Sequence, residues 1–274
     1  MSQRDKEKGK VGLYDASYGS FADEAYAAVR REAFGEDLGQ NSWLTTEELG
    51  RFTAWLELGP SSRLLDVACG SGGPALHVAR TAGCQVTGVD LHPDGIAAAN
   101  RMARERGLES RARFSQADAA GPLPFDGESF DAILCIDAIN HLRGRAAVLA
   151  EWRRLLAPGG RLVFTDPITV TGPLDSEEIA VRASIGVFLF VPPGVNERLL
   201  AGCGLRLLAL EDGTDNVAAI AGRRHDARAR RAEALVRAEG ADSFEGQQRF
   251  LAVASALAAE RRLSRLVYLA ERPA

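Results

Sequence analysis

Residues 63–74 constrain the fold of this 274-residue chain more than any other stretch. Residues 64–68 form a mostly apolar run, which is typical of a strand buried on both faces of a sheet. Gly70 and Gly72 break the run, and a helical pattern begins at Pro74, a residue that suits the first turn of a helix. Glycines let a ligand lie against bare backbone, and the first turn of a helix presents free N–H groups. The stretch therefore predicts a strand, a ligand-cradling loop and a helix.

Asp66 decides which ligand this loop is expected to cradle. Residues 70–75, Gly-Ser-Gly-Gly-Pro-Ala, also satisfy the glycine pattern of dinucleotide-binding loops, with alanine in the last position. A carboxylate just before the glycines would lie near the loop and repel a pyrophosphate group. The same negative charge suits S-adenosylmethionine, which carries an ammonium group and a sulfonium and has no phosphate. The loop and Asp66 together favour this cofactor.

Residues 65–72, Leu-Asp-Val-Ala-Cys-Gly-Ser-Gly, resemble the first motif of class I S-adenosylmethionine-dependent methyltransferases. The resemblance covers residues 60–168 and the final strand. Residues 40–43, Gln-Asn-Ser-Trp, and residues 262–268 are similar to bacterial small-molecule methyltransferases of the sarcosine/dimethylglycine and quinone-biosynthesis type. The resemblance implies a Rossmann-like α/β fold with a seven-stranded, mostly parallel sheet whose last strand is antiparallel. An N-terminal helical cover and a helical insertion before the last strand complete the expected architecture.

We expect a single methyltransferase domain over residues 1–274. Its parts are an N-terminal helical cover (1–58), a cofactor-binding core (60–168), a lid, helix and sixth strand (169–212), a helical insertion (213–262) and a last strand (263–274). The first five strands should end near Val67, Val89, Gln116, Ile136 and Asp166. The sixth strand, over 205–211, should lie beside the last strand, over 264–271.

Acidic residues follow the predicted strands of the core. Asp90 comes 20 residues after Gly70, which is the spacing expected for a carboxylate that binds ribose hydroxyls. The resemblance implies that Asp118 and its backbone neighbour meet the adenine amino group. The residues expected to bind the cofactor are Trp43, Asp66, Ala68, Gly70, Gly72, Asp90, Leu91, Asp118, Ala119, Cys135 and Ile136.

Residues 135–141 follow the fourth predicted strand, and ligands in open α/β sheets bind beyond the carboxyl ends of strands. An imidazole there can take a proton from a hydroxyl at neutral pH, so we interpret His141 as the acid/base or substrate-orienting residue. The alternative is that His141 only hydrogen-bonds backbone. The apolar segment 185–190 predicts a lid on the substrate side. The residues expected to contact the substrate are Tyr14, Tyr18, Asn140, Asp166 and Phe188.

The insertion is predicted to contain two helical stretches, over 215–239 and 243–262. Seven basic residues lie within 223–237, and acidic residues interrupt them. We interpret this cluster as a solvated helix face rather than a nucleic-acid contact.

Composition narrows the class of partner and the location. The net charge of −4 argues against a nucleic-acid partner. The four cysteines have no metal-ligand spacing, so they are expected to be small buried hydrophobes and no metal site is expected. The N-terminal sequence has no apolar signal core, and no apolar run approaches the roughly 20 residues that span a bilayer. We expect a cytoplasmic monomer or homodimer that does not act at a membrane.

The function favoured by these patterns is S-adenosylmethionine-dependent transfer of a methyl group to a nitrogen or oxygen of a small molecule, in secondary or specialised metabolism. One alternative is a nicotinamide-dependent oxidoreductase, but its catalytic Tyr-x-x-x-Lys pair needs a lysine, and none occurs after Lys10. The other alternative is a protein that keeps the cofactor-binding fold without catalysis. The intact set of acids and glycines argues against lost cofactor binding.

Overall fold

The computed structural model describes residue 18 and residues 23–274, and its sheet has the strand order β3-β2-β1-β4-β5-β7-β6. Strands β1 to β5 are parallel, and β7 runs antiparallel to both β5 and β6. The expected class I architecture is therefore confirmed, including the contact between the sixth and the last strand. The strands are β1 (Arg63–Val67), β2 (Gln85–Asp90), β3 (Ala112–Gln116), β4 (Phe130–Cys135), β5 (Leu156–Val170), β6 (Arg206–Asp212) and β7 (Leu263–Glu271).

Strand β5 is longer than expected because it absorbs the glycine-rich turn before it. The Gly159 N–H donates to the Arg272 carbonyl, and the Arg272 N–H donates to the Gly160 carbonyl, each at 2.8 Å. These bonds attach the turn to the end of β7. At its other end β5 continues past Asp166 to Val170, with a shift in its register against β7.

Apolar side chains on alternate strand positions form two cores, one on each face of the sheet. Leu64 packs with α4 (Thr46–Trp55), α5 (Gly73–Ala82) and α6 (Pro93–Glu105). The adjacent Leu65 packs with α7 (Arg145–Leu155) and α9 (Val195–Gly202) on the opposite face. Strands covered on both faces must be apolar on both, which explains the continuous apolar runs of β1 and β4.

Local signals set the ends of the core helices. The Thr45 hydroxyl accepts a hydrogen bond from the Glu48 N–H at 3.1 Å and caps α4. Proline occupies the first turn of α5 and of α6. Gly83 ends α5 with a φ of 71°, in the left-handed region that glycine adopts without strain. These ends place the N-termini of α5 and α6 beside the carboxyl ends of the strands.

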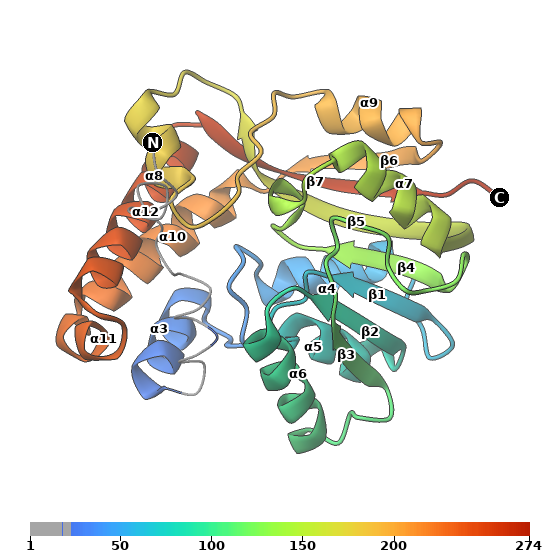
Figure 1. Ribbon diagram of the computed structural model, residues 1–274, viewed down its shortest axis with the longest axis horizontal. Coiled ribbons are helices and arrows are strands. Elements are labelled where there is room, and N and C mark those ends of the chain that lie inside the picture. The colour runs from blue at the N-terminus through green and yellow to red at the C-terminus, as the bar shows by residue number, and fades with distance from the viewer. Residues whose placement is uncertain (1–17, 19–22) are drawn as a thin grey trace.

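A group of helices lies beyond the carboxyl ends of the parallel strands, at the left of Figure 1. It consists of α3 (Glu24–Phe34), α8 (Ser176–Arg182), α10 (Thr214–Ala229), α11 (Ala232–Glu239) and α12 (Ala241–Ala259). The first stretch expected in the insertion is divided into α10 and α11 at Arg230 and Arg231, whose guanidiniums both bind Glu32 of α3. Within the described part of the chain, every helix is too short or too polar to cross a lipid bilayer.

Candidate functional site

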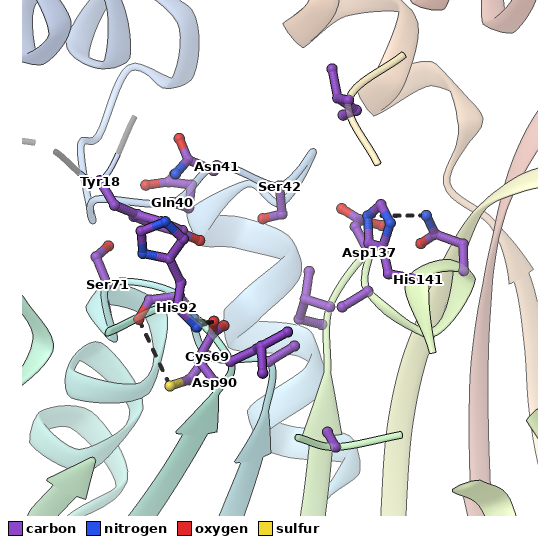
Figure 2. Close-up of a pocket in the computed structure, with 18 of the residues that line it drawn as sticks. Tyr18, Gln40, Asn41, Ser42, Cys69, Ser71, Asp90, His92, Asp137 and His141 are labelled. Atoms are coloured by element: carbon purple, nitrogen blue, oxygen red, sulfur yellow. Dashed lines mark hydrogen bonds between the residues drawn. The ribbon is translucent and has the colours of Figure 1, made fainter. Parts of the chain in front are cut away.

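A cavity of about 620 Å³ opens at the carboxyl ends of β1 to β4. Residues 68–71, 90–94 and 118–120 line one end of it, which we call the cofactor end. The other end, which we call the acceptor end, is lined by residues from 136–142 and by side chains of α8, α10 and α12. Figure 2 shows Tyr18, Asp90 and His92 at the first end and Asp137 and His141 at the second.

Gly70 and Gly72, in the loop after β1, are required for different reasons. Gly70 faces the cavity with a φ of 56°, and a Cβ there would lie 2.5 Å from the Tyr18 hydroxyl oxygen. Gly72 does not line the cavity. A Cβ on it would lie 2.7 Å from the Ala99 Cβ and 2.9 Å from the Phe114 ring, so Gly72 is required for packing of the loop against α6 and β3. The expected cradle is present, but only Gly70 of the pair faces a ligand.

Asp90 organises the glycine loop as well as facing the cavity. Its Oδ2 accepts a hydrogen bond from the Gly70 N–H at 2.8 Å, and its Oδ1 accepts one from the His92 N–H at 2.8 Å. An ionised carboxylate offers about four acceptor positions, so both oxygens retain a lone pair for a ligand hydroxyl. Asp90 can therefore hold the loop and bind a diol at the same time.

Asp66 is a buried acid at the cavity wall, with only 4% of its surface exposed. Burial raises the pKa of this carboxyl to about 8, and the negative charge of nearby Asp90 adds to the shift. A carboxylate in such a place is stabilised when a cation enters the cavity. Asp66 thus fits a ligand with an ammonium group better than one with a phosphate.

The N-terminal segment 38–43 lies directly on the glycine loop. The Ser71 hydroxyl donates to the Gly39 carbonyl at 2.6 Å. At the other end of the segment, the Trp43 N–H donates to Asp137 Oδ2 at 2.8 Å. Within the described residues, Asn41 Nδ2 is buried at the cavity wall without a hydrogen-bond partner, so it is a donor that a ligand can satisfy.

Asp137 connects the end of β4 to the N-terminal segment 38–43 and to β5. Its backbone is in the left-handed region, with a φ of 53°. Its Oδ1 accepts from the Thr165 hydroxyl at 2.6 Å and from Arg265 Nε at 2.7 Å. The fully buried Arg265 also donates to Glu48 Oε1 on α4 at 2.7 Å. Asp137 is therefore engaged in structural bonds.

His141 ends the short 3₁₀ helix η1 (Ile139–His141) and lines the acceptor end. Its Nδ1 lies 2.6 Å from the Val187 carbonyl oxygen, and because a carbonyl only accepts, Nδ1 carries the proton. Its Nε2 accepts from Asn140 Nδ2 at 3.2 Å. Burial lowers the pKa of His141 below its usual value, so the ring is neutral at pH 7 with Nε2 as its basic atom.

Asp166, expected to contact the substrate, is fully buried and does not line the cavity. Its carboxylate binds the Arg145 guanidinium, and Asn196 Nδ2 donates to it at 3.0 Å. Asp166 therefore ties β5 to α7 and α9 behind the acceptor end. Cys135 is also fully buried and outside the lining, and Tyr14 lies outside the described residues.

The structure brings most of the expected residues together around one cavity. The expected residues that line it are Tyr18, Trp43, Asp66, Ala68, Gly70, Asp90, Leu91, Asp118, Ala119, Ile136, Asn140, His141 and Phe188. The expected residues outside the lining are Gly72, Cys135 and Asp166. In the described part of the chain, no group of three His, Cys, Asp or Glu side chains is placed to hold a metal ion.

Three residues at the acceptor end were missed: Arg182, Arg224 and Phe250. The interpretation of cluster 223–237 as a solvated face is wrong for Arg224 and Arg228, which are 8% and 3% exposed. A signal was available, because both arginines continue the apolar stripe of α10 at helical spacing. That stripe packs against α12, so its arginines point inward.

Comparison with known sequences identifies the core. Residues 65–164 match the family model described as a methyltransferase domain. A 27-O-demethylrifamycin SV methyltransferase from Amycolatopsis mediterranei is 32% identical over 168 residues, which are 58% of this chain. The chain spans 61% of the length of that relative. The resemblance of this core to methyltransferases is thereby confirmed.

Solved structures show the same fold over nearly the whole chain. Phosphoethanolamine N-methyltransferase 2 from Haemonchus contortus, in complex with S-adenosyl-L-methionine, has a TM-score of 0.79 at 19% identity, covering 97% of this chain and 61% of that chain. The cyclase SpnF has a TM-score of 0.74 at 24% identity, covering 96% of each chain. Since SpnF is a cyclase, the fold by itself does not fix the reaction.

Proposed function

We propose that this chain is an S-adenosylmethionine-dependent methyltransferase that acts on a small molecule, because its core is similar to methyltransferase domains and its cavity has a suitable cofactor end. The observation that carries the proposal is the arrangement of Asp66, Gly70 and Asp90 around one cavity. A buried acid with a raised pKa, a glycine that faces the cavity and a second acid that holds the loop together fit an uncharged nucleoside joined to an ammonium-bearing chain.

Different residues of the cofactor end would contact different parts of such a cofactor. Asp66 would face the ammonium group, and Asp90 would accept hydrogen bonds from the ribose hydroxyls. Asp118 and Ala119 would border the adenine, with the exposed Leu91 covering the sugar. When bound, S-adenosylmethionine supplies an electrophilic methyl group on a sulfonium, so the protein mainly has to position the acceptor and exclude water.

His141 is the residue best placed to accept the acceptor's proton. Its protonated Nδ1 is fixed on the Val187 carbonyl, and this leaves Nε2 as the basic atom. Asn140 holds the ring from the other side, and its Oδ1 is buried without a hydrogen-bond partner among the described residues. An acceptor hydroxyl can donate to Asn140 Oδ1, and it can donate to Nε2 once it displaces Asn140 Nδ2 from that atom, which favours oxygen over nitrogen as the methylated atom.

Release of S-adenosylhomocysteine tests the proposed function. The protein is incubated with S-adenosylmethionine and a panel of phenols, carboxylates and amines, and both products are followed by mass spectrometry. We expect one class of acceptor to gain a methyl group in step with S-adenosylhomocysteine. Tight binding of S-adenosylmethionine with no transfer to any acceptor would favour a non-catalytic fold or a reaction of another kind.

Substitution of Asp90 tests the cofactor end. We expect Asp90→Asn to weaken S-adenosylhomocysteine binding more than tenfold, because a hydrogen bond to a charged group contributes about 1.5–3 kcal/mol and the bond to the Gly70 N–H is also disturbed. Isothermal titration calorimetry measures the affinity, and the exposed Asp126→Asn provides a control with the same change of charge. Unchanged affinity in folded Asp90→Asn protein would refute the assignment of Asp90.

A further inference from the structure

Charge is separated along the cavity. Asp66, Asp90 and Asp118 belong to the cofactor end, at the carboxyl ends of β1, β2 and β3. The acceptor end is lined instead by the guanidiniums of Arg182 and Arg224. The carboxylate of Asp137 also lines this end, but it accepts hydrogen bonds from Arg265, Thr165 and the Trp43 backbone. Among the described residues, two arginines therefore line the end where the acceptor would lie, and the carboxylate there is already hydrogen-bonded.

Arg182 is 1% exposed and is held against aromatic rings. Its guanidinium carbon lies 4.5 Å from the centre of the Phe250 ring and 5.5 Å from that of Phe188. The Phe188 ring in turn meets His141 edge-on, with 4.7 Å between the ring centres. Burial is the main cause of the lowered pKa of His141; the charge of Arg182 adds to it, and those of Asp166 and Asp137 oppose it. Arg182 and His141 thus lie on the same aromatic ring, that of Phe188.

Arg224 approaches the same end from α10. Its guanidinium carbon lies 5.7 Å from the centre of the Trp43 ring, and its Nη1 donates to the Asn41 carbonyl at 3.2 Å. Guanidiniums stacked on aromatic faces are held in fixed planes, and a fixed plane suits paired hydrogen bonds to a carboxylate or similar anion. Trp43, Phe188 and Phe250 add flat apolar walls that suit a conjugated ring system.

We propose that the acceptor is a planar, conjugated molecule with an anionic oxygen group, and that Arg182 and Arg224 recognise this group. The inference rests on the proposed function and adds the class of acceptor. A planar anion would stack on the aromatic walls, place its charge at the guanidiniums and present a hydroxyl to Asn140 and His141. Acceptors with a positive charge would be repelled from the same place.

Three matched probes test this assignment: para-hydroxybenzoate, para-hydroxybenzamide and para-hydroxybenzylamine. They share a phenol ring and differ in the charge of the substituent. Each is titrated into protein saturated with S-adenosylhomocysteine. We expect the benzoate to bind at least tenfold more tightly than the benzamide and the benzylamine to bind least. A rising salt concentration should weaken binding of the benzoate and leave the affinity for the benzamide unchanged.

Variants then assign the preference to the two arginines. Arg224→Gln and Arg182→Gln should each reduce the ratio of the benzoate affinity to the benzamide affinity several-fold. Arg224→Lys keeps the positive charge and should retain part of the benzoate preference. Arg237→Gln is the matched control, because Arg237 lies in the same insertion with its side chain 73% exposed. If Arg182→Gln does not fold, Arg224→Gln and the salt dependence still decide the question.

The outcomes separate this inference from the proposed function. Failure of S-adenosylhomocysteine to bind would overturn the proposed function. Normal binding of S-adenosylhomocysteine, with equal affinity for benzoate and benzamide or with no binding of any probe, would overturn the anionic acceptor alone. A benzoate preference that survives both Arg→Gln substitutions would also overturn it.

Discussion

Replacement of His141 by alanine should lower the turnover number by a factor on the order of 10²–10⁴ while the affinity for S-adenosylmethionine is kept. The reason is the state of His141, which lines the acceptor end: the Val187 carbonyl fixes its tautomer, so Nε2 is unprotonated and can take a proton once an acceptor hydroxyl displaces Asn140 Nδ2 from it. Initial rates at saturating cofactor, with an acceptor found in the panel, measure the effect. Calorimetry on the same variant checks that the cofactor still binds.

The pH profile distinguishes a base from a structural histidine. Burial lowers the pKa of His141 below 6.5, so turnover of the wild-type protein should be flat at pH 7 and fall only at lower pH, as Nε2 becomes protonated. His141→Ala should lose this acidic limb. His225→Ala is the control, since His225 lies on α10 and does not line the cavity. If the turnover number of His141→Ala is less than threefold below that of wild type, His141 has a structural role, and an amine acceptor that needs no base is favoured.

Asp66→Asn should weaken S-adenosylhomocysteine binding by roughly 10²-fold or more, because loss of one partner from a buried ion pair costs about 3–5 kcal/mol. The same substitution should stabilise the protein without ligand. Burial and Asp90 raise the pKa of Asp66 to about 8, so the folded protein holds this proton more tightly than the unfolded chain. Between about pH 4 and pH 8, Asp66 loses its proton in the unfolded chain but keeps it in the folded protein. The free energy of unfolding therefore decreases as the pH rises through this range.

Thermal unfolding and calorimetry check both parts of this prediction. Without ligand, Asp66→Asn should have a higher Tm than wild type at pH 7, and the difference should shrink at pH 5. Near pH 7, wild-type protein should release a proton on binding, because an ammonium group favours the ionised form of Asp66. Calorimetry in buffers of different ionisation enthalpy detects this release. Asp126→Asn is the control, and an Asp66→Asn protein that binds normally would contradict the role of Asp66.

The core strands could be predicted because their signals are local. The apolar runs of β1 and β4 stop just before a glycine or an acid, and burial on both faces requires such runs. The length of β5 depended instead on hydrogen bonds to Arg272, far along the chain. The break between α10 and α11 falls at two arginines that bind Glu32, on a helix that precedes the sheet. Contacts between distant segments leave no periodic trace in the sequence.

The two ends of the cavity also differed in how far they could be predicted from the sequence. The cofactor end is built from residues at the carboxyl ends of strands or just beyond them, so topology was enough to locate Asp66, Asp90 and Asp118. At the acceptor end, the same argument failed for Asp166, because Arg145 and Asn196 enclose it in a buried cluster. Arg182 and Arg224 come from helices outside the core. The apolar stripe of α10 indicates that Arg224 points inward, but which cavity it reaches depends on how the helices pack.

A calorimetric titration of S-adenosylhomocysteine and of NADH into the wild-type protein tests the central claim most directly. The cavity should bind one S-adenosylhomocysteine per chain in a saturable manner, and NADH should give no comparable heat, because the buried carboxyl of Asp66 at the glycine loop disfavours a pyrophosphate. Saturable binding of NADH in the absence of S-adenosylhomocysteine binding would contradict the assignment of this chain as a methyltransferase.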